Sequence, residues 1–374
     1  MNIKNKCGFF LTLSTSVVLA FNLANAKDFT MAPGFAPGST VDSGAEAFTN
    51  KVTELTNGNI TFTIHPLTLL SVPQMLNGVR DGVADVGVVL PMVFAAQFKE
   101  SNLIGDLAML GKYSPAMAGA TTEYMMTCSE CLAEYADNNL VYLGSGSTPD
   151  YGIQSTKPFV SVDDLKGSKL RSPNATYNRW IEHFGGVALT LPGNEIFEAV
   201  KQGVVDGALL SAGELSNIRM IDIVKHVTVG VPGGTYNLIN ISTFNRDTWN
   251  SVTDQERAAI VEASAYAVAV TTMGYYDQAV ESIAEAKALG IKVHEPSQEL
   301  SQASAEFVKQ DLANIATLAA DRGVENADAK VARFRELVTK WEKLNEGVTP
   351  TVENLTDLYK TEIFNKIDVE NYGK

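Results

Sequence analysis

The sequence predicts an α/β protein with two lobes, on the basis of three observations. The chain has 374 residues, and its length favours two domains because about 100–200 residues per domain is usual. Hydrophobic residues make up 45% and charged residues 19%, which is typical of a globular protein. Strand-like and helix-like segments alternate near the N-terminus, and one helix–Gly–strand unit occurs twice. This alternation indicates parallel sheets flanked by helices.

A secretory signal peptide is predicted for residues 1–26. Lys4 and Lys6 precede an apolar run from residue 9 to residue 21. Ala24-Asn25-Ala26 follows that run, completing the order of basic region, apolar region and cleavage site. A helix over the run would rise only about 20 Å, whereas the hydrocarbon core of a membrane is about 30 Å thick. We therefore expect cleavage after Ala26 and an exported protein that does not insert in a membrane afterwards.

The first part of the mature chain alternates strand and helix. Ala45, Phe48, Val52 and Leu55 recur at helical spacing, and Asn57-Gly58-Asn59 ends that helix. The expected elements are strands over 29–32, 60–65 and 84–89, with helices over 45–55 and 72–81.

One unit of this alternation returns later in the chain. Val79-Arg80-Asp81-Gly82-Val83-Ala84-Asp85 matches Val200-Lys201-Gln202-Gly203-Val204-Val205-Asp206. Each copy predicts a helix end, a glycine stop, and an aspartate that enters a buried strand. We interpret the two copies as equivalent units of two α/β lobes.

The rest of the chain is mostly helical. Thr253-Asp254-Gln255-Glu256 has the pattern of a capping box and begins a long helix that continues towards Ala288. A short strand is expected over 291–294. Further helices are expected over 298–322, 327–344 and 352–364.

The net charge, the histidine positions and the absence of known motifs together disfavour several classes of function. A net charge of −14 disfavours binding to nucleic acid or to an anionic membrane surface. The four histidines are too scattered for a local metal-binding pattern. No G-x-S-x-G motif and no complete phosphate-binding or dinucleotide-binding loop occurs. We therefore expect no metal, no cofactor and no enzymatic activity.

Cys128 and Cys131 form a C-x-x-C unit in the mature chain. Export permits a disulfide, and the same spacing also occurs in thioredoxin-like redox sites. The residues around the pair carry no other feature of a redox enzyme, and a metal site would need further ligands. We favour a structural disulfide and leave two inert thiols open.

The segment from Val162 to Asn174 contains a candidate ligand-binding residue. It predicts a short helical turn, a stop at Gly167, and a strand that ends near Arg171. Ligands of open α/β sheets bind beyond the carboxyl ends of the strands. An arginine there can hold a carboxylate through two parallel hydrogen bonds. By position alone, an ordinary surface arginine is an equally good interpretation.

Four motifs occur in order along the mature chain. They are Pro37-Gly38-Ser39, Val83-Ala84-Asp85-Val86-Gly87, Asp164-Leu165-Lys166-Gly167-Ser168-Lys169-Leu170-Arg171 and Gly203-Val204-Val205-Asp206-Gly207. With these motifs the chain resembles the substrate-binding proteins of TRAP transporters (tripartite ATP-independent periplasmic transporters), the family often labelled dicarboxylate-binding. The resemblance extends over roughly residues 29–344.

The resemblance implies a two-lobed periplasmic binding protein fold, with a cleft between the lobes and a long helix that spans both. We expect lobe I to comprise residues 27–149 plus about 237–275. Lobe II is expected to comprise 150–236 plus about 276–374, including the C-terminal helices. The implied function is that of a periplasmic receptor, which closes on a small organic carboxylate and delivers it to the membrane subunits of a TRAP permease.

The resemblance also carries over to individual residues. Arg171 matches the family's carboxylate-anchoring arginine, and Asn174 falls where the family often has a polar contact. Sialic-acid-type members have a second arginine where this chain has Tyr151, and many members carry Gln-Glu-Asn where it has Ala208-Leu209-Leu210. These departures disfavour a sugar acid. They favour a small monocarboxylate, a keto acid or an acid with an apolar tail, and leave a dicarboxylate or an ectoine-type zwitterion open.

Four aromatic residues are candidates for the walls of the ligand pocket. Phe35, Phe94, Tyr151 and Tyr236 occupy expected loop positions after strands, and pockets are mostly apolar. Ordinary packing explains each of them equally well. Two rival functions remain, namely a secreted enzyme acting on a small organic acid in the same cleft and a ligand receptor for a sensor protein.

Overall fold

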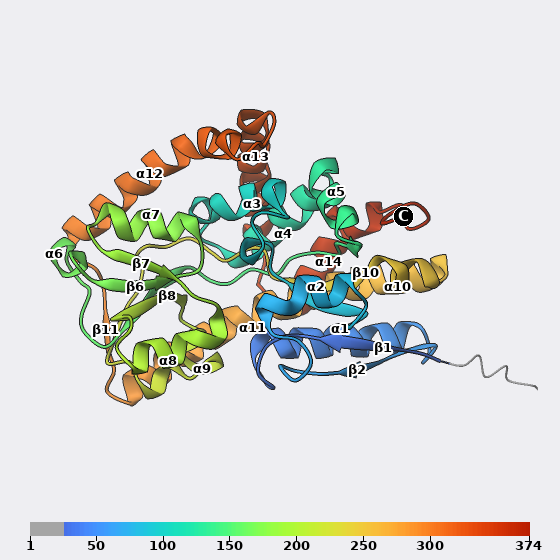
Figure 1. The fold of residues 1–374 in the computed structure, drawn as a ribbon, viewed down its shortest axis with the longest axis horizontal. Helices are drawn as coiled ribbons and strands as arrows, with labels where there is room; N and C mark the ends of the chain where they lie inside the picture. The colour runs from blue at the N-terminus through green and yellow to red at the C-terminus, as the bar shows by residue number, and fades with distance from the viewer. Residues whose placement is uncertain (1–25) are drawn as a thin grey trace, which may run out of the picture.

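The computed structural model describes residues 26–374, and residues 1–25 of the predicted signal peptide lie outside this range. Two β-sheets lie apart from one another, each covered by helices (Figure 1). The 35-residue helix α11 (Asp254–Ala288) contacts α1, β10 and α14 beside the first sheet, and α9 and β11 beside the second. The predicted two-lobed α/β fold with a helix that spans both parts is therefore confirmed.

The first sheet has the strand order β2-β1-β3-β10-β4. Its strands are β1 (Lys27–Ala32), β2 (Ile60–Ile64), β3 (Val86–Val89), β4 (Leu140–Val141) and β10 (Asn240–Asn245). Strands β1, β2 and β3 are parallel, as the alternation of strand and helix predicts. Strand β10 pairs antiparallel with both β3 and β4, so the sheet is mixed and not wholly parallel. Periodicity could not reveal β10's place, since it returns from the second half of the chain.

The second sheet has the strand order β11-β9-β5-β8-β6-β7. Its strands are β5 (Tyr151–Ser155), β6 (Lys169–Ser172), β7 (Val187–Thr190), β8 (Gly207–Ser211), β9 (His226–Thr228) and β11 (Lys292–His294). Strand β6 lies between β7 and β8 and runs parallel to both, and β5 is antiparallel to β8 and β9. The carboxyl ends of β6, β7 and β8 consequently meet at one edge.

Fourteen α-helices occur in the described residues. Besides α11 they are α1 (Thr40–Leu55), α2 (Met75–Arg80), α3 (Lys99–Asp106), α4 (Ser114–Met126), α5 (Ser129–Asp137), α6 (Val162–Leu165), α7 (Ala175–His183), α8 (Ile196–Lys201), α9 (Glu214–Asn217), α10 (Arg246–Ser251), α12 (Gln298–Asp321), α13 (Ala327–Asn345) and α14 (Val352–Glu362). None of the helices in residues 26–374 combines the length and the apolar character that crossing a membrane requires.

Two chain segments connect the sheets and run antiparallel to each other. The backbone N–H of Gly146 donates to the carbonyl of Ile239 at 2.9 Å, and that of Thr148 donates to the carbonyl of Tyr236 at 3.0 Å. The N–H of Tyr151 then donates to the carbonyl of Gly234 at 2.9 Å, at the start of β5. With α11 these segments form the connection between the two halves of the molecule, and they place Thr148, Tyr151 and Tyr236 between the sheets.

The two copies of the repeated unit have the same local structure. Asp85 and Asp206 each lie just before a buried strand, β3 and β8 respectively. The Asp85 carboxylate accepts a hydrogen bond from the N–H of Thr30 on β1 at 2.8 Å. In the second sheet, the Asp206 carboxylate accepts one from the N–H of Lys169 on β6, also at 2.8 Å. Each aspartate therefore satisfies the amide of the neighbouring parallel strand, which explains the recurrence of the motif.

The C-terminal helices pack beside the first sheet. Helix α13 packs along α4, and α14 packs along α11. Helix α12 lies across α3 and α7, which belong to opposite halves of the molecule, and forms the long arch seen in Figure 1. Helices α13 and α14, which were expected in lobe II, thus contact elements beside the first sheet. The division into lobes that move as units stays a prediction.

Cys128 and Cys131 are joined by a disulfide, with their Cα atoms 5.2 Å apart, and both residues are buried. The Cys128 sulfur also accepts a hydrogen bond from the N–H of Cys131 and thus caps α5. Chain-entropy arguments assign about 2 kcal/mol to closing so short a loop. We expect the double variant Cys128→Ser/Cys131→Ser, in which serine can still cap the helix, to lower the free energy of unfolding by about that amount. Urea denaturation with and without reductant tests this, and a wild-type stability that reductant leaves unchanged would contradict it.

Candidate binding site

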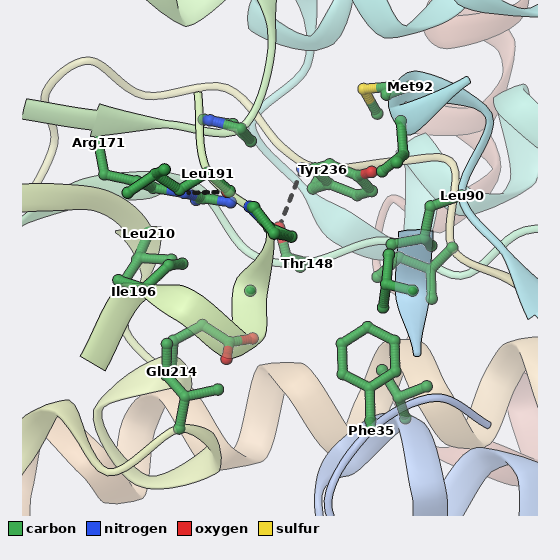
Figure 2. Close-up of a pocket in the computed structure, with 18 of the residues that line it drawn as sticks. Phe35, Leu90, Met92, Thr148, Arg171, Leu191, Ile196, Leu210, Glu214 and Tyr236 are labelled. Carbon is green, nitrogen blue, oxygen red and sulfur yellow. Dashed lines mark hydrogen bonds between the residues drawn. The ribbon is translucent and has the colours of Figure 1, made fainter. Parts of the chain in front are cut away.

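A cavity of about 240 Å³ lies between the two sheets. Arg171 and Glu214 line it from the second sheet's half (Figure 2). Phe35, Leu90 and Met92 line it from the opposite side. The connecting segments contribute Thr148, Tyr151, Tyr236 and Ile239, and α11 contributes Tyr275. Four of the six residues predicted as ligand-binding therefore lie together around one cavity, namely Arg171, Tyr151, Phe35 and Tyr236.

Arg171 is held in place by the strands on either side of it. It lies on β6, and its side chain is buried at the carboxyl-end edge of the sheet. Its Nε donates to the carbonyl of Leu191, which follows β7, at 3.0 Å, and its Nη1 donates to the carbonyl of Leu209 on β8 at 3.2 Å. A guanidinium has five N–H donors, so these two bonds fix its orientation and leave three donors for another partner.

Arg171 has no carboxylate within ion-pair distance in residues 26–374. Burial lowers the pKa of Arg171, and the nearby Tyr151 and Tyr236 oppose that shift. An arginine stays charged in proteins, and a buried charge is costly unless it is paired. Among the described residues, the Arg171 guanidinium therefore forms no ion pair in the cavity, although the Glu214 carboxyl lies near enough to favour its charged form.

Two tyrosine hydroxyls beside Arg171 can donate to a bound anion. No side-chain or backbone group in the described chain forms a hydrogen bond with the hydroxyl of Tyr151 or of Tyr236. Burial raises the pKa of both phenols, so both stay protonated and keep their donors. The Tyr151 ring stacks on Tyr177 with centroids 5.1 Å apart, and the backbone N–H of Tyr236 donates to the Thr148 hydroxyl at 3.0 Å. The stacking therefore orients the Tyr151 ring, and the hydrogen bond fixes the backbone from which the Tyr236 side chain extends.

The remaining lining is mostly apolar. Among the residues that share this character are Phe35, Val41, Val72, Leu90, Met92, Val93, Leu191, Ile196, Leu210, Ile218 and Ile239. Leu210 belongs to the segment Ala208-Leu209-Leu210, where the sequence predicts a less polar pocket. A ligand in this cavity therefore faces one cationic corner and an apolar opposite wall.

Two of the predicted site residues do not line the cavity. The Asn174 side chain caps α7 by accepting hydrogen bonds from the N–H groups of Thr176 at 3.0 Å and Tyr177 at 3.4 Å. Its Nδ2 lies 2.9 Å from the Met92 sulfur. Phe94 is partly buried against the hydrophobic core beside the cavity. For Asn174, the capping role explains why a polar residue follows β6 there.

Glu214 and Tyr275 line the cavity but were not predicted from the sequence. Glu214 begins α9 directly after β8, so the rule that ligands bind beyond the carboxyl ends of strands would have selected it. Tyr275 lies in the middle of the long helix α11, among residues with no functional pattern, and its place at the cavity depends on how that helix packs.

Among the residues that the structure describes, Glu214 is the one acidic residue that lines the cavity, just as Arg171 is the one cationic residue. It is partly buried, and burial raises its pKa to about 7. The Tyr275 hydroxyl and the Arg171 guanidinium favour the ionised form and limit this shift. At neutral pH the carboxyl is therefore divided between its charged and its neutral form.

Residues 26–374 contain no cluster of three or more histidine, cysteine, aspartate or glutamate side chains that could hold a metal ion. The two halves are joined by the connecting segments and α11, and a small cavity lies between them. This is the architecture of a solute-binding protein. The chain belongs to the family described as bacterial extracellular solute-binding protein, family 7, whose model matches residues 31–317. This membership confirms the family that the sequence motifs indicate, and with it the predicted role of an extracellular solute receptor.

A solute-binding protein of Albidiferax ferrireducens is 25% identical to this chain over 206 residues. That match covers 53% of this chain and 60% of the relative, so the aligned part spans less than two thirds of the relative's length.

Solved structures show the same fold at low sequence identity. A marine metagenome TRAP solute-binding protein specific for aromatic acid ligands, in complex with 3-hydroxybenzoate, has a TM-score of 0.75 and 20% identity, covering 85% of this chain and 99% of that one. A TRAP solute-binding protein from Rhodoferax ferrireducens, in complex with copurified benzoate, has a TM-score of 0.73 and 20% identity over 85% and 99% of the two chains. An extracytoplasmic solute receptor of Bordetella pertussis that binds pyroglutamic acid has a TM-score of 0.69 and 18% identity over 83% and 100%.

Proposed function

We propose that this protein is a periplasmic receptor for a small monocarboxylate with an apolar, ring-sized body. The observation that carries the proposal is Arg171, a buried cation at the cavity with three free donors and no ion-pair partner among residues 26–374. A planar guanidinium matches a carboxylate through two parallel hydrogen bonds. The hydroxyls of Tyr151 and Tyr236 can donate to the same anion.

The size of the cavity supports a small ligand. A cavity of about 150 Å³ is large enough to hold benzene, so about 240 Å³ accommodates one ring together with a carboxylate. The apolar side chains opposite Arg171, among them Phe35, Leu90 and Met92, favour a ring or a branched alkyl group there. The ligands of the benzoate-bound and 3-hydroxybenzoate-bound structures have this form, and we extend it to the present chain as part of the proposal.

The same lining disfavours more polar ligands. A dicarboxylate would need a second cation, and Arg171 is the single cationic residue among the described residues that line the cavity. A sugar acid would leave several hydroxyl groups against apolar side chains without hydrogen bonds, which is costly. We further propose that the loaded receptor delivers its ligand to the membrane subunits of a TRAP permease, after export directed by residues 1–26.

A ligand screen tests the proposal. The protein is exported with its own leader, purified, unfolded and refolded to remove bound ligand, and then melted with benzoate, 3-hydroxybenzoate, pyroglutamate, succinate and β-D-galacturonate. A ligand that binds only the folded state raises the melting temperature by mass action. We expect benzoate or 3-hydroxybenzoate to give the largest rise, and benzamide, which has nearly the same shape without the charge, to give none. A rise with succinate or galacturonate alone would contradict the proposed ligand class.

A further inference from the structure

Glu214 is an acidic residue that lines the cavity for which we propose a carboxylate ligand. Its carboxyl and the Arg171 guanidinium both line the cavity from the second sheet's half (Figure 2), yet they form no ion pair. The other groups that face Glu214 are the phenols of Tyr275 on α11 and Tyr151 on β5, together with the side chain of Asn217 on α9. None of these three groups carries a charge that could offset a second anion.

The charges in the cavity do not balance when a ligand is bound and Glu214 is ionised. Arg171 is the only cation in the described lining, so an ionised Glu214 and a bound carboxylate would be two anions facing one cation. Like charges at a shared site disfavour the charged form of one of them, and a ligand that displaces water from the cavity strengthens this effect. Pairing with the Arg171 guanidinium would favour the ionised form of the ligand carboxylate, so the proton is expected on the glutamate.

We propose that the receptor takes up one proton when it binds its carboxylate ligand, and that Glu214 carries this proton in the complex. The inference rests on the proposed function, because it requires an anionic ligand at Arg171. A protonated Glu214 also gains a donor, which its ionised form lacks. Burial raises the pKa of Glu214 to about 7 in the ligand-free protein. Protonating this side chain near neutral pH therefore requires little free energy.

The alternative is a zwitterionic ligand, whose ammonium group would pair with an ionised Glu214. An ammonium carries three donors and needs several acceptors. The wall opposite Arg171 is formed by apolar side chains such as Phe35 and Leu90, which offer it none. Beside Glu214 itself, the polar groups near it include the Tyr275 phenol and the Asn217 side chain, and the mostly apolar lining as a whole favours the monoanion with a neutral Glu214.

Calorimetric titration with benzoate at pH 6 and pH 8 tests the proposal, with two buffers of different ionisation enthalpy at each pH. For a free-protein pKa near 7 and a higher pKa in the complex, linkage gives about one proton taken up at pH 8 and about 0.1 at pH 6. The dissociation constant is expected to be about tenfold larger at pH 8 than at pH 6. At pH 8 most of the free protein lacks the proton on Glu214 that the complex requires, whereas at pH 6 most of it carries that proton.

The variant Glu214→Gln is expected to abolish both effects. It keeps a neutral hydrogen-bonding side chain, so benzoate should bind with a dissociation constant that changes less than about twofold between the two pH values. Glu198→Gln is the matched control, because Glu198 lies on α8 with 56% of its side chain exposed. This control should behave as the wild type does. Melting curves of both variants establish that they are folded.

Three other outcomes separate the possibilities. Benzoate binding to the wild type without proton uptake at pH 8 would overturn the role of Glu214 and leave the proposed receptor function intact. Wild-type affinity for benzoate that rises from pH 6 to pH 8, with weaker binding by Glu214→Gln at both pH values, would show that an ionised Glu214 supports binding and would likewise overturn the proposal. Absence of benzoate binding at either pH would overturn the proposed ligand class, and with it the proton coupling derived from that class.

Discussion

Arg171→Ala is expected to weaken the binding of benzoate by roughly 100- to 1,000-fold. Hydrogen bonds to charged groups contribute about 1.5–3 kcal/mol each, and Arg171 has enough free donors for two of them. Removing one partner of a desolvated charge pair costs about 2–5 kcal/mol, because the other charge is left buried without a partner. Isothermal titration calorimetry at pH 6, where Glu214 is mostly neutral, measures the change directly.

Two further variants separate charge from shape at this position. Arg171→Met keeps much of the side-chain volume without the charge, so we expect it to bind benzoate as poorly as Arg171→Ala does. Arg171→Lys keeps the charge but loses the planar fork and the bond from Nε to the carbonyl of Leu191, so an intermediate loss is expected. Affinities of Arg171→Ala and Arg171→Met within threefold of the wild type would show that the anion binds elsewhere.

Trp341→Ala is expected to lower the free energy of unfolding by about 3–5 kcal/mol. Trp341 is fully buried on α13, and its Nε1 donates to the carboxylate of Glu123 on α4 at 2.6 Å. Its ring centroid lies 5.5 Å from that of Tyr359 on α14. A Cβ atom built on Gly119 of α4 would come within 2.2 Å of the indole, so the helices meet there without spare room. Truncation therefore leaves a cavity where three helices join.

Urea denaturation measures this loss, and an exposed neighbour provides the control. Glu342 is the next residue of α13 and is exposed, so Glu342→Ala should change the free energy of unfolding by no more than about 0.5 kcal/mol. Trp341 does not line the ligand cavity, and the affinity of folded Trp341→Ala for benzoate should stay within twofold of the wild type. A loss of less than about 1 kcal/mol would contradict the packing of α13 on α4.

Much of the fold could be predicted because its signals are local. Thr253 caps α11 and forms the reciprocal capping box with Glu256, as their spacing in the sequence indicates. Some boundaries differ for equally local reasons. Helix α1 begins at Thr40 because the Ser39 hydroxyl accepts from the N–H of Asp42, and the predicted helix over 72–81 starts with a 3-10 turn that contains Pro73.

The site was predicted only in part. Arg171 follows from the rule for strand ends and from its motif, and the structure places it at the cavity with Phe35, Tyr151 and Tyr236. Its binding role stays a prediction, as do the roles of the others. Asn174 lies outside the lining, and its side chain accepts hydrogen bonds from the first N–H groups of α7, which a position-based interpretation could not show.

The sequence by itself determined the α/β class, the repeated unit with its aspartate and the long helix, and it singled out Arg171, which the structure places at the cavity. Each of these depends on hydrogen bonds or periodicity within a few consecutive residues, or on a motif of such residues. The tertiary structure decided the antiparallel place of β10, the packing of α13 on α4, and the meeting of Glu214 and Tyr275 with Arg171. These contacts join segments far apart in the chain, and their geometry is set by how the sheets and α11 pack around the crossing segments.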